Sequence, residues 1–120
     1  MVDRTSLQGK FLFADRPKLE SAGLPEMKPV QLAARDGLPL HGYLTQPVGA
    51  SAAGPMVLLV HGGPWGRDRW NFDPYAQWLA NRGYVVLQVN FRASAGYGRK
   101  FLNAGNRQWG KAMQTDLLDA

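Results

Sequence analysis

Two short and mainly apolar runs dominate the pattern of hydrophobic and polar positions along this chain. They cover residues 56–60 (MVLLV) and 84–89 (YVVLQV). A short apolar run bounded by turn residues is typical of a strand buried on both faces of a parallel sheet. Between the runs, Asp73 and Pro74 have the residue types of a helix N-cap and first helical position, and Gly83 those of a helix end. Strand, helix and strand with short connections predict a parallel βαβ unit and the α/β class.

Helical spacing appears on both sides of the second run. The helix after Asp73 carries four residues on one face, at positions i, i+3, i+4 and i+7: Tyr75, Trp78, Leu79 and Arg82. Arg82 also complements the negative carboxyl end of that helix. A second helix is predicted from about Arg107, and its apolar positions are Met113, Leu117 and Leu118.

A hairpin is predicted ahead of the first buried strand. Residues 30–33 and 38–44 flank the pair Asp36-Gly37. Asp-Gly between two extended segments favours a type I′ turn, in which both central residues take a positive φ. We place this antiparallel hairpin at the edge of the sheet. His41 lies on it and is interpreted as a solvent-facing strand residue, because no group of His, Asp or Glu at metal-ligand spacing surrounds it; no metal site is predicted.

Residues 1–27 form a segment apart from the rest. Residues 9–14 (GKFLFA) have the composition of one strand, and residues 18–27 are rich in proline, glycine and charge, like a linker. A disordered tail is the alternative interpretation. The loop over residues 46–54 then connects the hairpin to the first buried strand. The chain is accordingly divided into residues 1–27 and residues 28–120.

Composition narrows the classes of function. The chain has 120 residues, of which 45% are hydrophobic, enough for one small domain with a core. The net charge of +5 comes from scattered basic residues without a nucleic-acid motif, so no nucleic-acid partner is predicted. The absence of cysteine excludes disulfides, thiolate catalysis and zinc–thiolate sites within these 120 residues. No apolar run approaches the ~20 residues of a membrane span, and no membrane partner is predicted.

The candidate chemistry lies in the turn that follows the first buried strand, His61-Gly62-Gly63-Pro64. Two glycines without a Cβ leave their backbone N–H groups uncovered, and Pro64 biases Gly63 toward an extended shape. The carboxyl end of a buried strand is where an α/β sheet binds ligands. Gly63 is the preferred N–H donor and Gly62 the second candidate. A tight turn without chemistry is the alternative interpretation.

Several blocks of the sequence occur together in one order. They are residues 35–37 (RDG), 42–45 (GYLT), 60–65 (VHGGPW), 77–84 (QWLANRGY), 89–92 (VNFR), 96–98 (GYG), 101–106 (FLNAGN) and 109–110 (WG). With these blocks, the chain from Lys28 onward resembles the catalytic domain of the prolyl oligopeptidase family of serine peptidases, on its acylaminoacyl-peptidase and dipeptidyl-aminopeptidase side. One departure is Ala93 before Ser94, where the family usually has Gly-Ser. This leaves the conformation of that loop open.

The resemblance implies a fold and a domain arrangement. Residues 28–120 are expected to form the amino-terminal portion of an α/β-hydrolase domain, with an antiparallel edge hairpin followed by a parallel βαβ unit. A β-propeller precedes this domain in the family. The resemblance therefore implies that residues 1–27 are the last propeller strand and its connection.

The resemblance also implies roles for individual residues. The HGGP turn supplies half of an oxyanion hole in α/β-hydrolases, and the second N–H comes from the residue after the nucleophile. His61 stands where some family members carry a tyrosine whose hydroxyl assists, and both assistance and a merely orienting role stay open. Trp65 and Arg92 are candidate substrate-binding residues. The alternatives are a packed indole for Trp65, and for Arg92 a buried guanidinium that braces the loops against Asp68 or Asp73.

The catalytic triad of such a fold is not found in these residues. The triad follows the order Ser, acid, His, with the serine in a G-x-S-x-G elbow, and no such elbow occurs here. Ser94 lies in Ala-Ser-Ala, and neither His41 nor His61 follows a nucleophile and an acid. The resemblance implies that nucleophile, acid and base lie beyond Ala120.

The full-length protein is therefore expected to hydrolyse peptide bonds through an acyl-enzyme, without a cofactor, in the cytoplasm. Its expected partners are a peptide substrate, the rest of the hydrolase domain and a β-propeller. The chain of residues 1–120 alone is expected to be inactive. A carboxylesterase of the same fold and a catalytically inert fragment are the alternatives.

Overall fold

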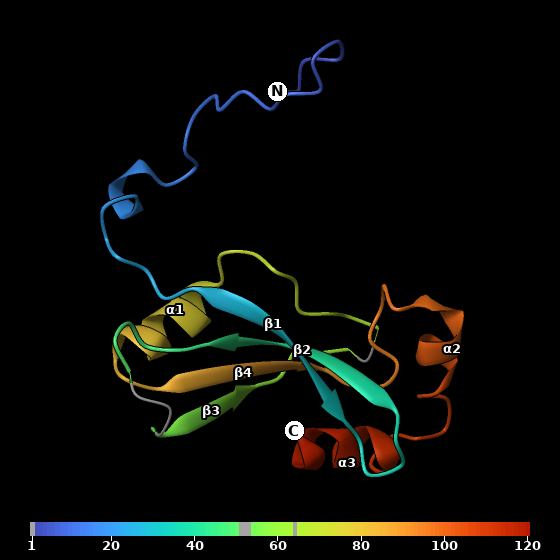
Figure 1. Ribbon diagram of the computed structural model, residues 1–120. Helices are drawn as coiled ribbons and strands as arrows, with labels where there is room; N and C mark the ends of the chain where they lie inside the picture. The colour runs from blue at the N-terminus through green and yellow to red at the C-terminus, as the bar shows by residue number, and fades with distance from the viewer. Residues whose placement is uncertain (1, 51–53, 64) are drawn as a thin grey trace.

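The computed structural model describes residues 2–50, 54–63 and 65–120. Pro64 of the predicted turn and residues 51–53 of the predicted loop lie outside the described residues. The elements in chain order are the 3₁₀ helix η1 (Pro17–Leu19), β1 (Met27–Ala33), β2 (Pro39–Thr45), β3 (Met56–Leu59), α1 (Pro74–Asn81), β4 (Val85–Asn90), α2 (Gly98–Asn103) and α3 (Ala112–Asp119). Figure 1 shows them as a mixed sheet with helices around it.

The sheet has four strands in the order β1-β2-β4-β3. β1 and β2 pair antiparallel, β2 pairs antiparallel with β4, and β3 pairs parallel with β4. This confirms both the hairpin at the sheet edge and the parallel βαβ unit formed by β3, α1 and β4. The fold class predicted from the sequence is correct.

The turn of the hairpin differs from the predicted type I′. Among the residues of this turn only Gly37 has a positive φ, of +82°. The N–H of Gly37 donates to the Ala34 carbonyl at 2.7 Å, and the N–H of Ala34 donates to the Leu38 carbonyl at 3.0 Å. This is a three-residue loop in which a type I turn is followed by a left-handed glycine. The type I′ prediction was wrong because Asp36 keeps a negative φ.

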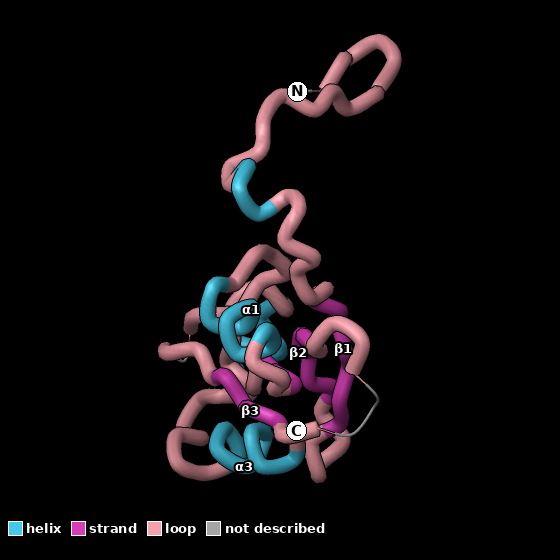
Figure 2. The backbone as a smooth tube through the Cα atoms, turned by 90° about the vertical axis from the view of Figure 1, so that its left-hand side faces the viewer, coloured by secondary structure: helices cyan, strands magenta, loops and turns pink. Residues whose placement is uncertain are grey.

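Helices cover the two faces of the sheet, with α1 and α3 on opposite sides (Figures 1 and 2). On the α3 side lies the main apolar core, formed by Ala34, Leu40, Leu87, Val89 and Phe101. Leu117 and Ala120 from the carboxyl end of the chain pack against it. This face is the one that fixes α3 to the hairpin.

The helix α1 begins as the sequence predicts. The Asp73 carboxylate accepts from the backbone N–H groups of Tyr75 and Ala76, both at 2.9 Å, and Pro74 is the first helical residue. The residues that α1 buries are Ala76 and Ala80. Two members of the predicted face, Tyr75 and Trp78, are exposed instead, because the small alanines allow the helix axis to approach the sheet closely.

The two apolar strands differ in burial. Every residue of β4 is buried, as predicted for a central strand. In β3 the side chain of Met56 is exposed, as is that of Val60 just after the strand, and Val57, Leu58 and Leu59 are only partly buried. The prediction of burial on both faces is confirmed for β4 and is wrong for β3 in this structure.

Sequence reasoning was less accurate toward the carboxyl end. The last helix begins at Ala112 rather than near Arg107, because Arg107 adopts a left-handed φ of +59° that is incompatible with a helix. Met113 is buried and Leu117 packs on the core, whereas Leu118 is exposed. The short helix α2 was not predicted.

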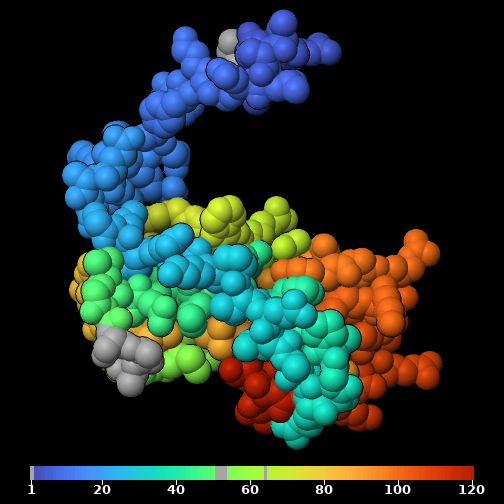
Figure 3. Space-filling view, in the orientation of Figure 1, coloured from blue at the N-terminus to red at the C-terminus, as the bar shows by residue number. Residues whose placement is uncertain are grey.

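Residues 2–26 extend away from the sheet as an arm (Figures 1 and 3). The predicted strand over residues 9–14 was wrong: among the described residues of the arm, the β pairing is a single bridge between Val2 and Gly9. Phe11 and Phe13 are largely exposed, so packing of their side chains does not stabilise a strand there. The linker assignment of residues 1–27 stays a prediction. None of the helices formed by the described residues has the length and apolar character needed to cross a membrane.

Candidate functional site

The turn at residues 61–63 lies at the carboxyl end of β3, beside the carboxyl end of β4. Gly62 and Gly63 are exposed, and within the described residues no protein acceptor takes either backbone N–H. Gly63 has a φ of +146°, and a Cβ at this position would lie 2.8 Å from the backbone nitrogens of Trp65 and Gly66. Only glycine fits here, since both the backbone conformation and the space exclude a side chain. Whether these N–H groups bind an anion stays a prediction.

A further glycine closes the loop over the turn. A Cβ on Gly66 would lie 2.6 Å from the Gly62 carbonyl oxygen and 3.2 Å from His61 Nδ1. The Gly66 carbonyl accepts from the N–H of Ala95 at 3.0 Å, which ties the loop to the segment after β4. Sequence reasoning missed Gly66, although its spacing of three residues from Gly63 is a visible signal.

The imidazole of His61 is held on three sides. Its ring stacks on Phe91, with centroids 4.7 Å apart and planes 14° apart. Nδ1 lies 2.9 Å from the Gly62 carbonyl oxygen, and Nε2 lies 2.9 Å from the hydroxyl of Ser94. Because a carbonyl only accepts, Nδ1 carries the proton and, in the neutral ring, Nε2 accepts from Ser94. Both ring nitrogens therefore already have partners inside the loop.

The loop leaves the site at Asp68, where a buried amide holds it. The fully buried Asn90 accepts from the Asp68 N–H at 2.8 Å and donates through Nδ2 to the Asp68 carbonyl at 3.2 Å. The Asp68 carboxylate accepts from Gln88 Nε2 at 3.2 Å, while its Oδ2 is buried and has no partner among the described residues. Burial raises the pKa of the Asp68 carboxyl.

Tyr97 connects this loop to the hairpin. The guanidinium of Arg67 lies 4.6 Å from the Tyr97 ring centroid, and its Nη2 donates to the Tyr97 hydroxyl at 3.2 Å. The His41 ring stacks on the same phenol, with centroids 4.5 Å apart and planes 4° apart. The prediction of a solvent-facing His41 was wrong, because the stacking leaves it only partly exposed. Burial raises the pKa of the Tyr97 hydroxyl.

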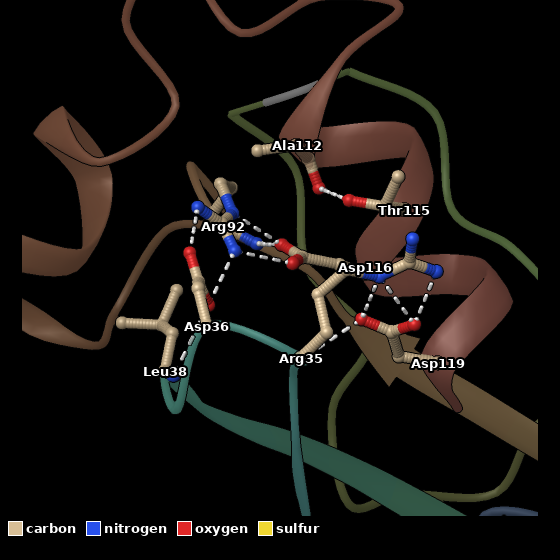
Figure 4. Close-up of polar contacts among 8 residues, drawn as sticks. All are labelled: Arg35, Asp36, Leu38, Arg92, Ala112, Thr115, Asp116 and Asp119. Atoms are coloured by element: carbon tan, nitrogen blue, oxygen red, sulfur yellow. Dashed lines mark hydrogen bonds and ion pairs between the residues drawn. The ribbon is translucent and has the colours of Figure 1, made fainter.

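Arg92 lies on the other side of the segment after β4 and is nearly buried. Its Nε and Nη2 contact the two carboxylate oxygens of Asp116 at 2.8 and 2.6 Å, and its Nη1 contacts Asp36 at 2.9 Å (Figure 4). Hydrogen bonds from the guanidinium to Asp116, and then to Asp36, raise the pKa of Arg92. The bracing interpretation is confirmed, but the predicted partners Asp68 and Asp73 were wrong. Contact of Arg92 with substrate stays a prediction.

A second pair extends this brace. Arg35 contacts Asp119 through Nη2 at 2.6 Å and Nε at 2.9 Å, and its backbone N–H donates to the same carboxylate at 2.8 Å. We name the five charged residues the carboxylate clasp: Arg35, Asp36, Arg92, Asp116 and Asp119. The clasp joins the hairpin turn, the segment after β4 and α3. Sequence reasoning missed the acids of α3, whose spacing of three residues places them on one helix face.

A cavity of about 210 Å³ opens beside the turn. It is lined by Gly63, Phe91, Trp109, Gly110, Met113, Gln114 and Leu117. Trp65 is two-thirds exposed and is not among the lining residues. Of the predicted site residues, His61, Gly62, Gly63 and Trp65 thus lie in one loop, and the Arg92 guanidinium is occupied by the clasp.

Comparison with known proteins gives consistent results. The model of the prolyl oligopeptidase family matches residues 70–120. The chain is 52% identical over 126 residues to dipeptidyl aminopeptidase BIII of Pseudoxanthomonas mexicana, covering 98% of this chain and 18% of that protein. It is 37% identical over 139 residues to dipeptidyl peptidase family member 6 of Caenorhabditis elegans, covering 98% of this chain and 19% of that protein.

Solved structures of peptidases resemble the fold. A puromycin-hydrolyzing peptidase of Mycobacterium tuberculosis matches with a TM-score of 0.84 and 31% identity, covering 98% of this chain and 19% of that one. An acylaminoacyl peptidase of Pyrococcus horikoshii matches with a TM-score of 0.80 and 25% identity, covering 92% and 18%. The chain spans about a fifth of the length of these relatives.

Proposed function

This chain belongs to the prolyl oligopeptidase family of serine peptidases, and we propose that it supplies the oxyanion-binding turn of a longer peptidase of that family. In this proposal the Gly63 N–H, with Gly62 as the second candidate, holds the developing oxyanion during acyl transfer. A second N–H comes from the residue after the nucleophile. Nucleophile, acid and base are supplied by residues beyond Ala120.

The observation that carries this proposal is that Gly62 and Gly63 are exposed and that their backbone N–H groups have no protein acceptor among the residues that the structure describes. Fixed donors aimed at a developing negative charge stabilise a transition state because they need no reorganisation during the reaction. Contacts with neighbouring residues hold the turn in a fixed conformation. Gly66 packs over it, and the ring of His61 anchors its start to the segment after β4.

We assign His61 an orienting role. An imidazole that assists the oxyanion directly must point an N–H at it, and here Nδ1 is used by the Gly62 carbonyl while Nε2 is used by Ser94. The ring instead fixes the direction of the Gly62 peptide. Trp65, exposed and directly after the turn, is the proposed contact for the substrate.

Peptides are the proposed substrates, and the names of the relatives, which are dipeptidyl peptidases and a peptidase, support this choice over esters. A carboxylesterase uses the same turn on a different acyl group. Comparing kcat/KM for dipeptidyl amides and short acyl esters on the full-length protein separates the two. A preference for esters would contradict the peptidase assignment.

The test of the turn is Gly63→Ala in the full-length protein. A methyl group at this position meets the backbone nitrogens of Trp65 and Gly66, so the peptide must rotate and carry its N–H away. We expect kcat to fall by about 10²–10³, as for other oxyanion donors, with little change in KM. The matched control is Gly37→Ala, which also places a methyl group at a positive φ but in open space. Near-normal kcat in a folded Gly63→Ala protein would refute the proposal.

A further inference from the structure

The carboxamide of Asn90 pairs with both backbone polar groups of Asp68, as the backbone of a neighbouring strand would. Its Oδ1 accepts from the Asp68 N–H at 2.8 Å, and its Nδ2 donates to the Asp68 carbonyl at 3.2 Å. One side chain thereby satisfies both backbone polar groups of a residue that lies outside the sheet. Asn90 itself is fully buried at the last position of β4.

Hydrogen bonds tie the loop of residues 61–68 to β4 and the segment after it, including those from Gln88 to the Asp68 carboxylate and from Arg67 to the Tyr97 hydroxyl. His61 is held by Ser94, the Gly66 carbonyl by the N–H of Ala95, and Asp68 by Asn90. The start of the loop is also fixed covalently by β3. At its far end the Asp68 carboxylate also accepts from Gln88 and the Asp68 carbonyl from Arg67 Nε, but among the described residues Asn90 is the side chain that contacts both the N–H and the carbonyl of Asp68.

The orientation of this amide is itself fixed. The Asp68 N–H requires an acceptor, which assigns Oδ1 to it and Nδ2 to the Asp68 carbonyl. Nδ2 also donates to the Tyr97 hydroxyl at 2.8 Å, and Arg67 donates to that same hydroxyl. A flipped amide would place its NH₂ against the Asp68 N–H and its oxygen against the Asp68 carbonyl, and would lose both hydrogen bonds to Asp68.

We propose that Asn90 is a positioning residue for the oxyanion-binding turn: its carboxamide fixes the far end of the loop at Asp68 and so keeps the Gly63 N–H in place. This inference rests on the proposed function of the turn. Preorganised donors must be held within a fraction of an ångström, and the groups that lock them contribute to kcat without touching the substrate.

The sharpest test is Asn90→Asp in the full-length protein. The ionised carboxylate keeps an acceptor for the Asp68 N–H but lacks a donor for the Asp68 carbonyl. A protonated carboxyl of the same shape restores that donor. Full burial disfavours the ionised form and so raises the pKa of the new carboxyl, whereas the Asp68 N–H and the nearby Arg67 guanidinium oppose that shift.

The expected result is a pH-dependent rescue. At pH 8 the variant loses about 10–100-fold in kcat with little change in KM, the scale of a misplaced catalytic group. As the pH falls, the ratio of its kcat to that of the wild type rises, because the protonated carboxyl mimics the amide. The titratable or charged groups facing this position are His41, Arg67, Asp68 and Tyr97, with His61 near Asp68. All are present in both proteins, so the ratio isolates the substitution.

Two further variants provide a matched control and a second test of the positioning role. Asn103→Asp makes the same chemical change at an exposed position of α2 and should leave kcat unchanged. Tyr97→Phe keeps the ring and removes one hydrogen-bond partner of the Asn90 Nδ2. It should lower kcat several-fold even if Asn90→Asp fails to fold.

Combining Asn90→Asp with Gly63→Ala separates the positioning role of Asn90 from the proposed function of the turn. If both residues act through one donor, the double variant loses much less kcat than the product of the two single losses. If Gly63→Ala lowers kcat while a folded Asn90→Asp and Tyr97→Phe do not, the positioning role is overturned and the proposed function stands. If Gly63→Ala has no effect, the proposed function fails, and any loss at Asn90 has another cause.

Discussion

The methyl group of Ala93 occupies the space that a side chain on Gly105 would need. A Cβ built on Gly105 overlaps the Ala93 Cβ and lies 3.2 Å from its Cα. Ala93 has a φ of +78°, and its N–H donates to the Phe101 carbonyl at 3.1 Å. The departure from Gly-Ser noted in the sequence is therefore accommodated by a left-handed alanine and a glycine opposite it.

Ala93→Gly should stabilise the protein. A left-handed conformation costs an alanine about 1–2 kcal/mol, and glycine removes this cost. Part of the gain is offset because glycine makes the unfolded chain more flexible. We expect the free energy of unfolding to rise by about 0.5–1 kcal/mol in denaturant titrations of the full-length protein. Ala95→Gly, the same change two residues away without a positive φ, should lower stability instead. Equal effects at both positions would contradict the strain at Ala93.

Gly105→Ala should be strongly destabilising, and Ala93→Gly should partly rescue it. The rescue follows because the main clash is between two methyl groups, and removing either relieves it. The measurement is a double-mutant cycle on the free energy of unfolding, with an expected coupling of about 1–3 kcal/mol. Additive effects would show that the two residues do not share this space.

The two acids that α3 contributes to the carboxylate clasp should differ in how much they stabilise the protein. Asp116→Asn leaves the nearly buried Arg92 guanidinium without its main counter-charge, and we expect a loss of about 3–5 kcal/mol. Asp119→Asn, the matched control three residues later, should cost far less because its partner Arg35 is exposed to solvent. Thermal unfolding of the two variants compares them directly. A larger loss at Asp119 would reverse the assignment.

The clasp also predicts how stability depends on pH. Hydrogen bonding to Arg92 lowers the pKa of Asp36, and hydrogen bonding to Arg35 lowers that of Asp119, both below the ordinary value of 3.8. A carboxyl with a depressed pKa contributes stability that is complete above its unfolded value and is lost as the pH falls through its folded value. The unfolding midpoint should therefore drop on acidification below about pH 4. In the Asp36→Asn/Asp119→Asn double variant this drop should be shallower, and an unchanged slope would contradict the assignment.

The chain of residues 1–120 should not react with a fluorophosphonate probe. Its Ser94 hydroxyl lies 2.9 Å from His61 Nε2, a contact that superficially resembles a nucleophile and its base. The serine is fully buried, however, and its hydroxyl points into the loop rather than toward a substrate. Intact-mass analysis should find no adduct on the chain and one adduct on the full-length protein. An adduct at Ser94 would overturn the view that this serine only orients His61.

Local signals in the sequence were sufficient for much of the fold. The Asp73 N-cap, the left-handed Gly83 and the apolar run of β4 each depend on neighbouring residues, and all three predictions are confirmed. The position of the turn after β3 was predicted in the same way. Whether that turn acts on an oxyanion stays a prediction.

The features that the sequence did not predict depend on contacts between distant parts of the chain. The carboxylates that reach Arg92 come from the hairpin turn and α3, 56 and 24 residues away, and no spacing rule identifies them. His41 is half-buried because Tyr97 stacks on it, which alternation within one strand does not indicate. Asn90 was noticed as part of a motif, but its pairing with Asp68 becomes visible only when the two segments are placed side by side.

The strand order β1-β2-β4-β3 has a consequence for the order of events during synthesis. The hairpin of β1 and β2 leaves the ribosome first and β3 follows, but these two parts share no hydrogen-bonded edge. The strand that joins them, β4, is translated last of the four and must insert between two pieces that are already present. At roughly 5–20 residues per second, β3 waits more than a second for its partner. During that interval β3 lacks the strand with which it pairs in the finished sheet.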